Sequence, residues 1–121
     1  ICTDKLMELS SGAKSLANVV CAVGGASLDK LPSGKDWRAK YEARFPKQFQ
    51  VYSPYTYDAT MVLVDAMKRA NSTDPKVYGP KLVDAAYQGV TAKVMFEPNG
   101  ELKNPAMTLY VYKEGKKVAV N

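Results

Sequence analysis

Histidine is absent from this 121-residue chain, and only two of its residues are cysteines. The lack of histidine removes the commonest general base and the commonest metal ligand. Two cysteines cannot build a four-cysteine zinc site, and a cysteine nucleophile would have no histidine to activate it. We therefore expect a protein that is not an enzyme and that carries no cofactor and no metal.

Long apolar runs are also missing. The longest run, residues 19–23, is far shorter than the roughly 20 apolar residues with which a helix spans a bilayer. The composition is otherwise ordinary, with 46% hydrophobic and 24% charged residues, and it excludes a disordered tail. The length fits a single compact unit.

Positive charge is in excess, with 17 Lys and Arg against 12 Asp and Glu and a net charge of +5. Such a balance can indicate a nucleic acid or another anionic partner. The lysines are scattered, however, and no basic stripe alternates with aromatic residues. We therefore predict no nucleic-acid partner and interpret the charge as a solvated surface.

The first half of the chain follows a strand–helix–strand pattern. Residues 1–4 have the pattern of a strand end, a helix is predicted from Leu6 to Ala17, and residues 19–23 are typical of a strand buried on both faces. This order predicts a parallel sheet. A further helix is predicted over residues 33–45, with Ser33 as its N-cap and Pro46 as its end.

The second half begins with helices and ends with strands. Ser53 as N-cap and Pro54 in the first turn predict a helix that continues to Ala70, apolar most of the way round and largely buried. Pro75 and Pro80 each predict a helix start, and Gly89 a helix C-cap. Apolar and polar residues alternate from residue 90 onward, which predicts a strand, and residues 97–100 predict a tight turn. Strands predicted at 109–112 and 116–120 flank a Glu-Gly pair, which predicts an antiparallel hairpin.

Two positions could bind a ligand. Asp4 is placed at the carboxyl end of a predicted strand, where open α/β sheets bind ligands, and its carboxylate could pair with an ammonium group; it could equally cap the next helix. Tyr52 belongs to a tyrosine cluster with Tyr55 and Tyr57 that suits a cleft wall, or else packs at a helix start. The residues alone leave both alternatives open.

The two cysteines, Cys2 and Cys21, both fall in predicted strands. They could form a disulfide if the strands are neighbours and the two Cα atoms approach within about 7 Å. The alternative is a pair of buried free thiols.

Four segments resemble motifs of one family, the type I periplasmic solute-binding proteins. Residues 51–59, VYSPYTYDA, resemble the family's helix start YAPYAYDA, and residues 96–102, FEPNGEL, resemble its turn FDxNGDL. Residues 110–118 are similar to its closing hairpin YxVYQxxDGKxV, and residues 2–6 to its strand end SDGL. The four segments occur in the family's order over essentially the whole chain. Within the family, the resemblance is to the leucine/isoleucine/valine-binding proteins of branched-chain amino-acid transporters.

The resemblance implies an α/β fold of the Venus-flytrap type, in which two lobes enclose a ligand. Because the family members are longer, we expect this chain to be a C-terminal fragment with a parallel sheet and a terminal antiparallel hairpin. Residues 1–50 would belong to the second lobe, residues 51–90 would supply crossover helices to the first lobe, and residues 91–121 would return to the second lobe.

The resemblance also implies a function. The protein would bind a small solute, a branched-chain or other aliphatic amino acid, in the periplasm and present it to the membrane permease of an ABC transporter. Asp4 matches the acidic position that pairs with the ligand's α-ammonium group, and Tyr52 matches an aromatic residue that lines the cleft. Lys5 stands where the family often has glycine, and its charge would weaken the attraction of Asp4 for an ammonium group.

Two other functions and one assembly state remain as hypotheses. A ligand-sensing receptor or regulator domain could use the same fold, and a small redox enzyme could use Cys2 and Cys21, although no CxxC motif is present. We also expect a homo-oligomer, because the apolar helix that follows Pro54 needs packing on more than one side.

Overall fold

The computed structural model describes residues 3, 5–10, 16–27, 30–31 and 33–120. Its contacts divide the chain into two compact units, one formed by residues 1–27 with 106–121 and the other by residues 28–105. Both units contain helices and strands, as the sequence predicts. No helix in the described ranges is long and apolar enough to cross a membrane.

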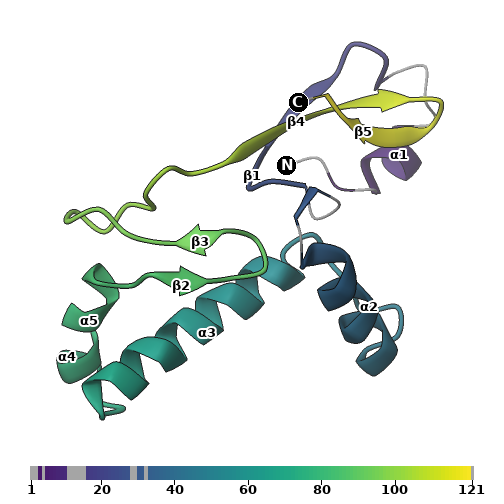
Figure 1. Ribbon diagram of the computed structural model, residues 1–121. Helices are drawn as coiled ribbons and strands as arrows, with labels where there is room; N and C mark the ends of the chain where they lie inside the picture. Colours follow the sequence, from purple (N-terminus) through teal and green to yellow (C-terminus); the bar gives the residue numbers. More distant parts are fainter. Residues whose placement is uncertain (1–2, 4, 11–15, 28–29, 32, 121) are drawn as a thin grey trace. The chain divides into compact units, whose positions relative to one another are not determined.

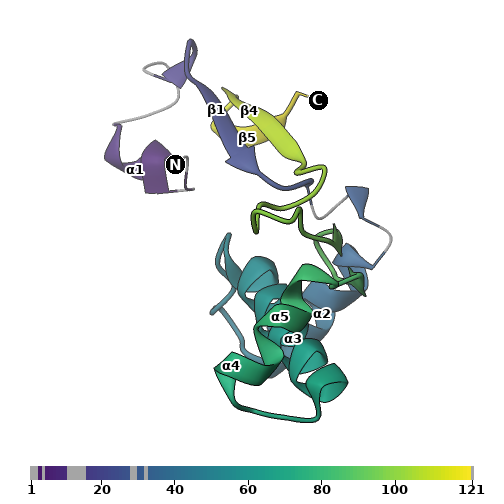
Figure 2. The same cartoon turned by 90° about the vertical axis from the view of Figure 1, so that its left-hand side faces the viewer.

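The first unit contains a three-stranded antiparallel sheet. Its strands are β1 (Val20–Gly24), β4 (Met107–Lys113) and β5 (Lys116–Ala119), in the order β1-β4-β5. Helix α1 (Lys5–Leu9) lies to one side of these strands (Figure 2). A small core forms on that side. It consists of the buried residues Leu16, Cys21 and Tyr112, with Leu6, Met7, Val19 and Tyr110 packed against them.

All described strand pairs are antiparallel. The parallel pair predicted for the first strands involves residues 1, 2 and 4, which lie outside the described residues. The sequence did not predict that β1 pairs with β4, with Val20 opposite Val111 and Gly24 opposite Met107. A hydrophobic run identifies a buried strand, but it does not identify the distant strand with which that run pairs.

The predicted C-terminal hairpin is confirmed. Strands β4 and β5 are joined at Glu114 and Gly115, whose φ angles are 48° and 76°. Two positive φ angles are the requirement of a type I′ turn, whose twist matches that of the two strands. Gly115 adopts this conformation without steric cost, whereas Glu114 has a Cβ atom that disfavours it.

Replacing Glu114 with asparagine should therefore stabilise the chain. Asparagine tolerates the left-handed conformation, and Asn-Gly is the preferred type I′ pair, so we expect the free energy of unfolding to rise by about 0.5 kcal/mol. Gly115→Ala should lower it by about 1 kcal/mol. Urea unfolding of the two variants measures both changes, and a destabilised Glu114→Asn variant would contradict the assigned turn.

The second unit contains four helices and a short two-stranded ribbon among its described residues. The helices are α2 (Gly34–Arg44), α3 (Ser53–Ala70), α4 (Pro75–Tyr78) and α5 (Pro80–Val83), and the ribbon joins β2 (Tyr87–Gln88) to β3 (Lys93–Val94). Figure 1 shows that the ribbon runs along α3 and that α4 and α5 pack near the C-terminal end of α3. Helix α3 is thus the central element of this unit.

Helix α3 has the predicted extent but not the predicted burial. It spans Ser53–Ala70 and ends at Asn71, whose φ of 49° is left-handed. Only every fourth residue is buried, namely Pro54, Asp58, Val62 and Ala66. The expectation of a largely buried helix is therefore wrong for this unit, because its neighbours pack against one stripe and leave residues such as Leu63 exposed.

The predictions for the segment after α3 are partly confirmed. Pro75 and Pro80 begin helices, and the side chain of Asp74 caps α4 by accepting a hydrogen bond from Lys76 N at 2.9 Å. The C-cap assigned to Gly89 is wrong, since α5 ends at Val83 and the chain then enters β2. The predicted turn at 97–100 is present, with Gly100 N donating to the carbonyl of Glu97 at 2.8 Å.

Candidate functional site

Of the two predicted ligand-binding residues, the structure describes Tyr52, whereas Asp4 lies outside the described residues. Tyr52 is the N-cap residue of α3, and its carbonyl accepts a hydrogen bond from Thr56 N at 2.9 Å. The residue is 51% exposed. The helix start therefore fixes the backbone of Tyr52 while its ring remains accessible to a ligand.

A tight turn before α3 sets the position of Tyr52. Ser53 N donates to the carbonyl of Gln50 at 3.0 Å, and Gln50 N donates to Ser53 Oγ at 3.0 Å. The Ser53 hydroxyl also lies 3.4 Å from the Tyr41 hydroxyl, to which it donates. Ser53 was predicted to be the N-cap; the structure instead makes it the first helical residue, and its side chain closes the turn.

An aromatic cluster holds α2 against the first turns of α3. The Trp37 ring stacks on Tyr41 with 5.1 Å between centroids and lies 5.5 Å from Tyr57. Tyr41 in turn contacts Phe45 at 5.2 Å and Phe49 at 6.1 Å. Such ring pairs stabilise by about 0.5–1.5 kcal/mol each beyond their buried area. The predicted tyrosine cluster is therefore divided, since Tyr57 packs in this cluster and Tyr52 does not.

Asp58, in the second turn of α3, is the most buried polar residue among the described residues. It is 3% exposed, and its Oδ1 accepts a hydrogen bond from Val90 N at 2.8 Å. Its Oδ2 accepts two more, from Thr91 N at 2.7 Å and from the Thr91 hydroxyl at 2.5 Å. The three bonds compensate the carboxylate for its lost hydration and join α3 to the loop after β2.

The sequence did not predict this role of Asp58. One signal could have revealed it. Asp58 falls on the four-residue repeat that includes Pro54 and Val62, so the helix pattern places it on the buried stripe. A buried carboxylate requires hydrogen-bond donors, and the sequence does not say which distant backbone supplies them.

Position 89 requires glycine because a larger residue would clash with Asp58, and not because a helix ends there. A Cβ atom at Gly89 would lie 2.5 Å from Asp58 Oδ2 and 2.9 Å from the carbonyl oxygen of Ala92. Gly89 N donates to that same carbonyl at 2.9 Å. Any side chain here would push the loop away from the carboxylate that holds it.

Replacing Asp58 with asparagine should destabilise the fold. The amide NH2 of asparagine would face an N–H donor, so at least one charge-assisted bond is lost and the free energy of unfolding should fall by about 1.5–3 kcal/mol. Asp65→Asn is the matched control on the same helix. Asp65 forms a partly exposed ion pair with Arg69 at 2.8 Å, and its loss should cost less than about 1 kcal/mol.

Chemical denaturation of both variants checks this prediction. Equal losses from Asp58→Asn and Asp65→Asn would show that the buried carboxylate does not anchor the loop.

The neighbourhood of Asp58 also affects a tyrosine. Burial raises the pKa of Tyr87 above the ordinary value of 10.0, and the charges of Tyr57, Asp58 and Asp65 raise it further. The folded chain therefore keeps the phenolic proton at a pH where the unfolded chain has lost it. This contribution to stability is present below pH 10 and is lost as the pH rises through the higher pKa of the folded state.

We accordingly expect the free energy of unfolding to fall at alkaline pH, and to fall less steeply in Tyr87→Phe. Thermal unfolding between about pH 9 and 11 measures the slope. Tyr78→Phe is the control among the other tyrosines, and the same slope in all three proteins would contradict the assignment to Tyr87.

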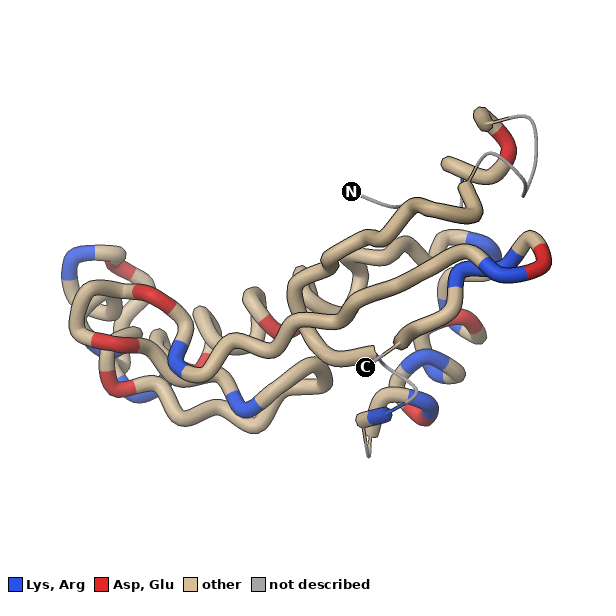
Figure 3. Tube along the Cα trace, turned by 90° about the horizontal axis from the view of Figure 1, so that it is seen from above, with Lys and Arg blue, Asp and Glu red and all other residues tan. Residues whose placement is uncertain are grey.

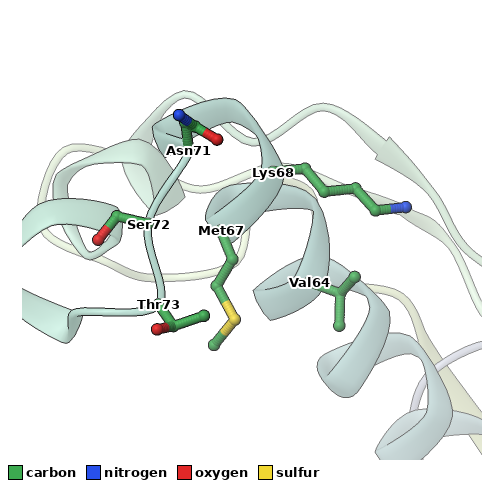
Figure 4. A pocket seen from close by; sticks show the side chains of 6 residues that line it. All are labelled: Val64, Met67, Lys68, Asn71, Ser72 and Thr73. Atoms are coloured by element: carbon green, nitrogen blue, oxygen red, sulfur yellow. The ribbon is translucent and has the colours of Figure 1, made fainter.

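A shallow hollow lies at the other end of α3. It has a volume of about 550 Å³ and is lined by Val64, Met67, Lys68, Asn71, Ser72 and Thr73 (Figure 4). The Lys68 side chain extends away from Asn71, Ser72 and Thr73 in that view. The Ser72 hydroxyl already accepts a hydrogen bond from Asp74 N at 3.1 Å. Because its polar groups do not converge on one point, we assign no ligand to this hollow.

The predicted disulfide concerns a residue outside the described part of the chain, Cys2. Cys21 lies in β1, is 5% exposed and has no free thiol. The pairing of Cys2 with Cys21 stays a prediction. Within the described ranges, no three His, Cys, Asp or Glu side chains gather into a group that could hold a metal ion.

Comparison with known proteins identifies the family. A family model described as "Periplasmic binding protein" matches residues 5–117. The chain belongs to the periplasmic binding protein family. Among curated protein sequences, none matches this chain.

A solved structure agrees with this family assignment. The leucine binding protein LivK from Thermotoga maritima MSB8 superposes with a TM-score of 0.81 at 20% sequence identity. The match covers 98% of this chain and 34% of LivK, so the chain spans about a third of the length of its structural neighbour. The likeness shows the type I periplasmic-binding fold, which confirms the predicted fold class.

The assignment of residues 1–50, 51–90 and 91–121 to two lobes remains a prediction. The contacts within this periplasmic binding protein place the chain's unit boundaries between residues 27 and 28 and between residues 105 and 106. The roles of Asp4 and Tyr52 toward a ligand also remain predictions.

Proposed function

We propose that the protein is the substrate-binding component of an ABC transporter and that its solute is a branched-chain or other aliphatic amino acid. The observation that carries the proposal is the likeness to a leucine binding protein over 98% of the chain, together with the family match over residues 5–117. Because the chain spans 34% of that neighbour, the proposal concerns a longer protein of which this chain would form the C-terminal part.

The proposed action is binding without chemical conversion. The complete protein would enclose one solute molecule in the periplasm and deliver it to the membrane permease. Such a protein needs a preformed site, because side chains that are ordered before binding lose less entropy when the ligand arrives. The turn at Ser53 and the aromatic cluster around Tyr41 support this requirement by fixing the start of α3.

Two side chains would make the specific contacts. The carboxylate of Asp4 would pair with the α-ammonium group of the amino acid, and the exposed ring of Tyr52 would cover its aliphatic side chain. Lys5 is the first residue of α1 and is exposed. Its charge beside Asp4 would reduce the attraction for a cationic group, and solvent would screen most of that effect.

The test is calorimetric titration of the complete protein with leucine. Asp4→Asn should weaken binding by about 1.5–3 kcal/mol, the typical contribution of a hydrogen bond to a charged group. Lys5→Ala should tighten binding by less than about 1 kcal/mol. Asp36→Asn, an exposed acidic residue in the first turn of α2, should leave the affinity unchanged.

The outcomes separate the site from the function. Unchanged affinity in Asp4→Asn would show that Asp4 only caps a helix. No heat of binding with leucine, isoleucine, valine or alanine would instead contradict the amino-acid proposal as a whole.

A further inference from the structure

One turn of the second unit contains the only Asn-Gly pair in the sequence, Asn99 and Gly100. Glu97 N donates to the carbonyl of Glu101 at 2.8 Å, and Gly100 N donates to the carbonyl of Glu97 at 2.8 Å. Gly100 has a φ of 87°. These features define a three-residue hairpin loop, in which a type I turn is followed by a left-handed residue. Asparagine followed by glycine is thus held in one defined conformation.

The side chain of Asn99 is folded back toward the peptide that follows it. Its Oδ1 accepts a hydrogen bond from Glu101 N at 3.0 Å. Asparagine often bonds in this way to the backbone two residues further on. The bond holds the carboxamide carbon Cγ near the intervening nitrogen, Gly100 N. The N–H of Glu101 would also stabilise negative charge on Oδ1 if that nitrogen added to Cγ.

The pair is open to water in the described structure. Pro98, Asn99 and Gly100 are all exposed. A Cβ atom built on Gly100 would meet no heavy atom within 4 Å. Glycine also lacks the side chain that shields the backbone nitrogen of other residues from close approach. Solvent and base can therefore reach both reacting atoms.

We infer that Asn99 is a site of spontaneous deamidation, a covalent modification with water as its co-reactant. A base removes the proton of Gly100 N, the nitrogen adds to Cγ of Asn99, and the Cγ–Nδ2 bond breaks with loss of ammonia. Water then opens the cyclic imide. Cleavage of the new N–Cγ bond gives aspartate, and cleavage of the bond from the nitrogen to the backbone carbonyl carbon gives isoaspartate. One water is consumed, one ammonia is released, and no group is oxidised or reduced.

One contact opposes the first step. The proton of Gly100 N is hydrogen-bonded to Glu97, and this bond must open before the proton leaves. Hydrogen bonds in exposed turns open by local fluctuation at small cost, so the contact slows the reaction without preventing it.

The other described asparagines lack the same combination of features. Asn104 precedes a proline, which has no N–H to deprotonate. Asn71 precedes Ser72, and Asn18 precedes a valine, so a side chain stands beside each nitrogen. These residues are internal controls for the reaction at Asn99.

The two products would change the turn differently. Acidic residues, red in Figure 3, already flank it, since Glu97 precedes it and Glu101 follows it. Aspartate at position 99 adds a negative charge between them but can still accept the bond from Glu101 N. Isoaspartate adds a methylene to the backbone and makes Cγ part of the main chain, so that bond is lost. The inference is independent of the solute that the complete protein binds.

Peptide mass spectrometry of the complete protein, after incubation in mildly alkaline buffer made with ¹⁸O-labelled water, tests the proposal. The label marks conversion that occurs during the incubation. We expect Asn99 to convert at least about tenfold faster than Asn71, and Asn104 to stay unchanged. Enzymatic methylation of isoaspartyl carboxylates should detect isoaspartate at position 99.

Two variants test the route. Gly100→Ala should slow conversion at Asn99 at least about tenfold and leave the rate at Asn71 unchanged. Because a side chain strains the turn at this positive φ, Asn99→Gln is the second variant. It keeps the glycine, and it should form no product at position 99, since glutamine would have to close a larger ring. Circular dichroism checks that both variants retain the wild-type spectrum.

Three results would overturn the proposal. The first is conversion at Asn99 no faster than at Asn71, which a turn covered by the rest of a longer protein would also give. The second is an unchanged rate at Asn99 in Gly100→Ala. The third is aspartate without isoaspartate, because direct hydrolysis of the carboxamide gives aspartate alone.

Discussion

The carboxylate of Asp58 is the constraint on which the larger unit depends. It is buried in the second turn of α3, and its three hydrogen bonds come from residues 32 and 33 positions further along the chain. Burying a carboxylate away from water is costly unless hydrogen-bond donors surround it. The positions of α3 and of the loop at Val90 and Thr91 are therefore coupled. The same contact leaves no room for a side chain at Gly89.

The start of α3 is held at the same end of the helix as this anchor. Asp58 lies one turn beyond Pro54, which is fully buried, and the aromatic cluster of α2 fixes the same end of the helix through Trp37 and Tyr57. Tyr52 is then the residue at the helix start whose backbone is held and whose ring is half exposed. The proposed contact with a solute would use this ring, which the helix start holds in place before the ligand arrives.

Much of the fold could be predicted because the decisive signals are local. Proline in the first turn places the start of α3, and the Glu-Gly pair places the turn between β4 and β5. These features depend on the φ angles that a few consecutive residues allow.

The features that were missed all depend on contacts between distant residues. Strand β1 pairs with β4, and Asp58 accepts hydrogen bonds from residues more than 30 positions away. The buried stripe of α3 likewise depends on which elements pack against the helix. Periodicity does not identify such partners. Gly89 shows the same limit, because position 89 requires glycine to make room for the Asp58 carboxylate of α3 rather than for its own backbone conformation.

The central claim is that the start of α3 forms part of a solute site. An NMR titration of the ¹⁵N-labelled complete protein with leucine tests it most directly, since each backbone amide reports separately. The account predicts saturable shifts at the amides of Tyr52 and Ser53, with those of Val77 and Val83 unchanged. Saturable binding that leaves Tyr52 and Ser53 unshifted would contradict it.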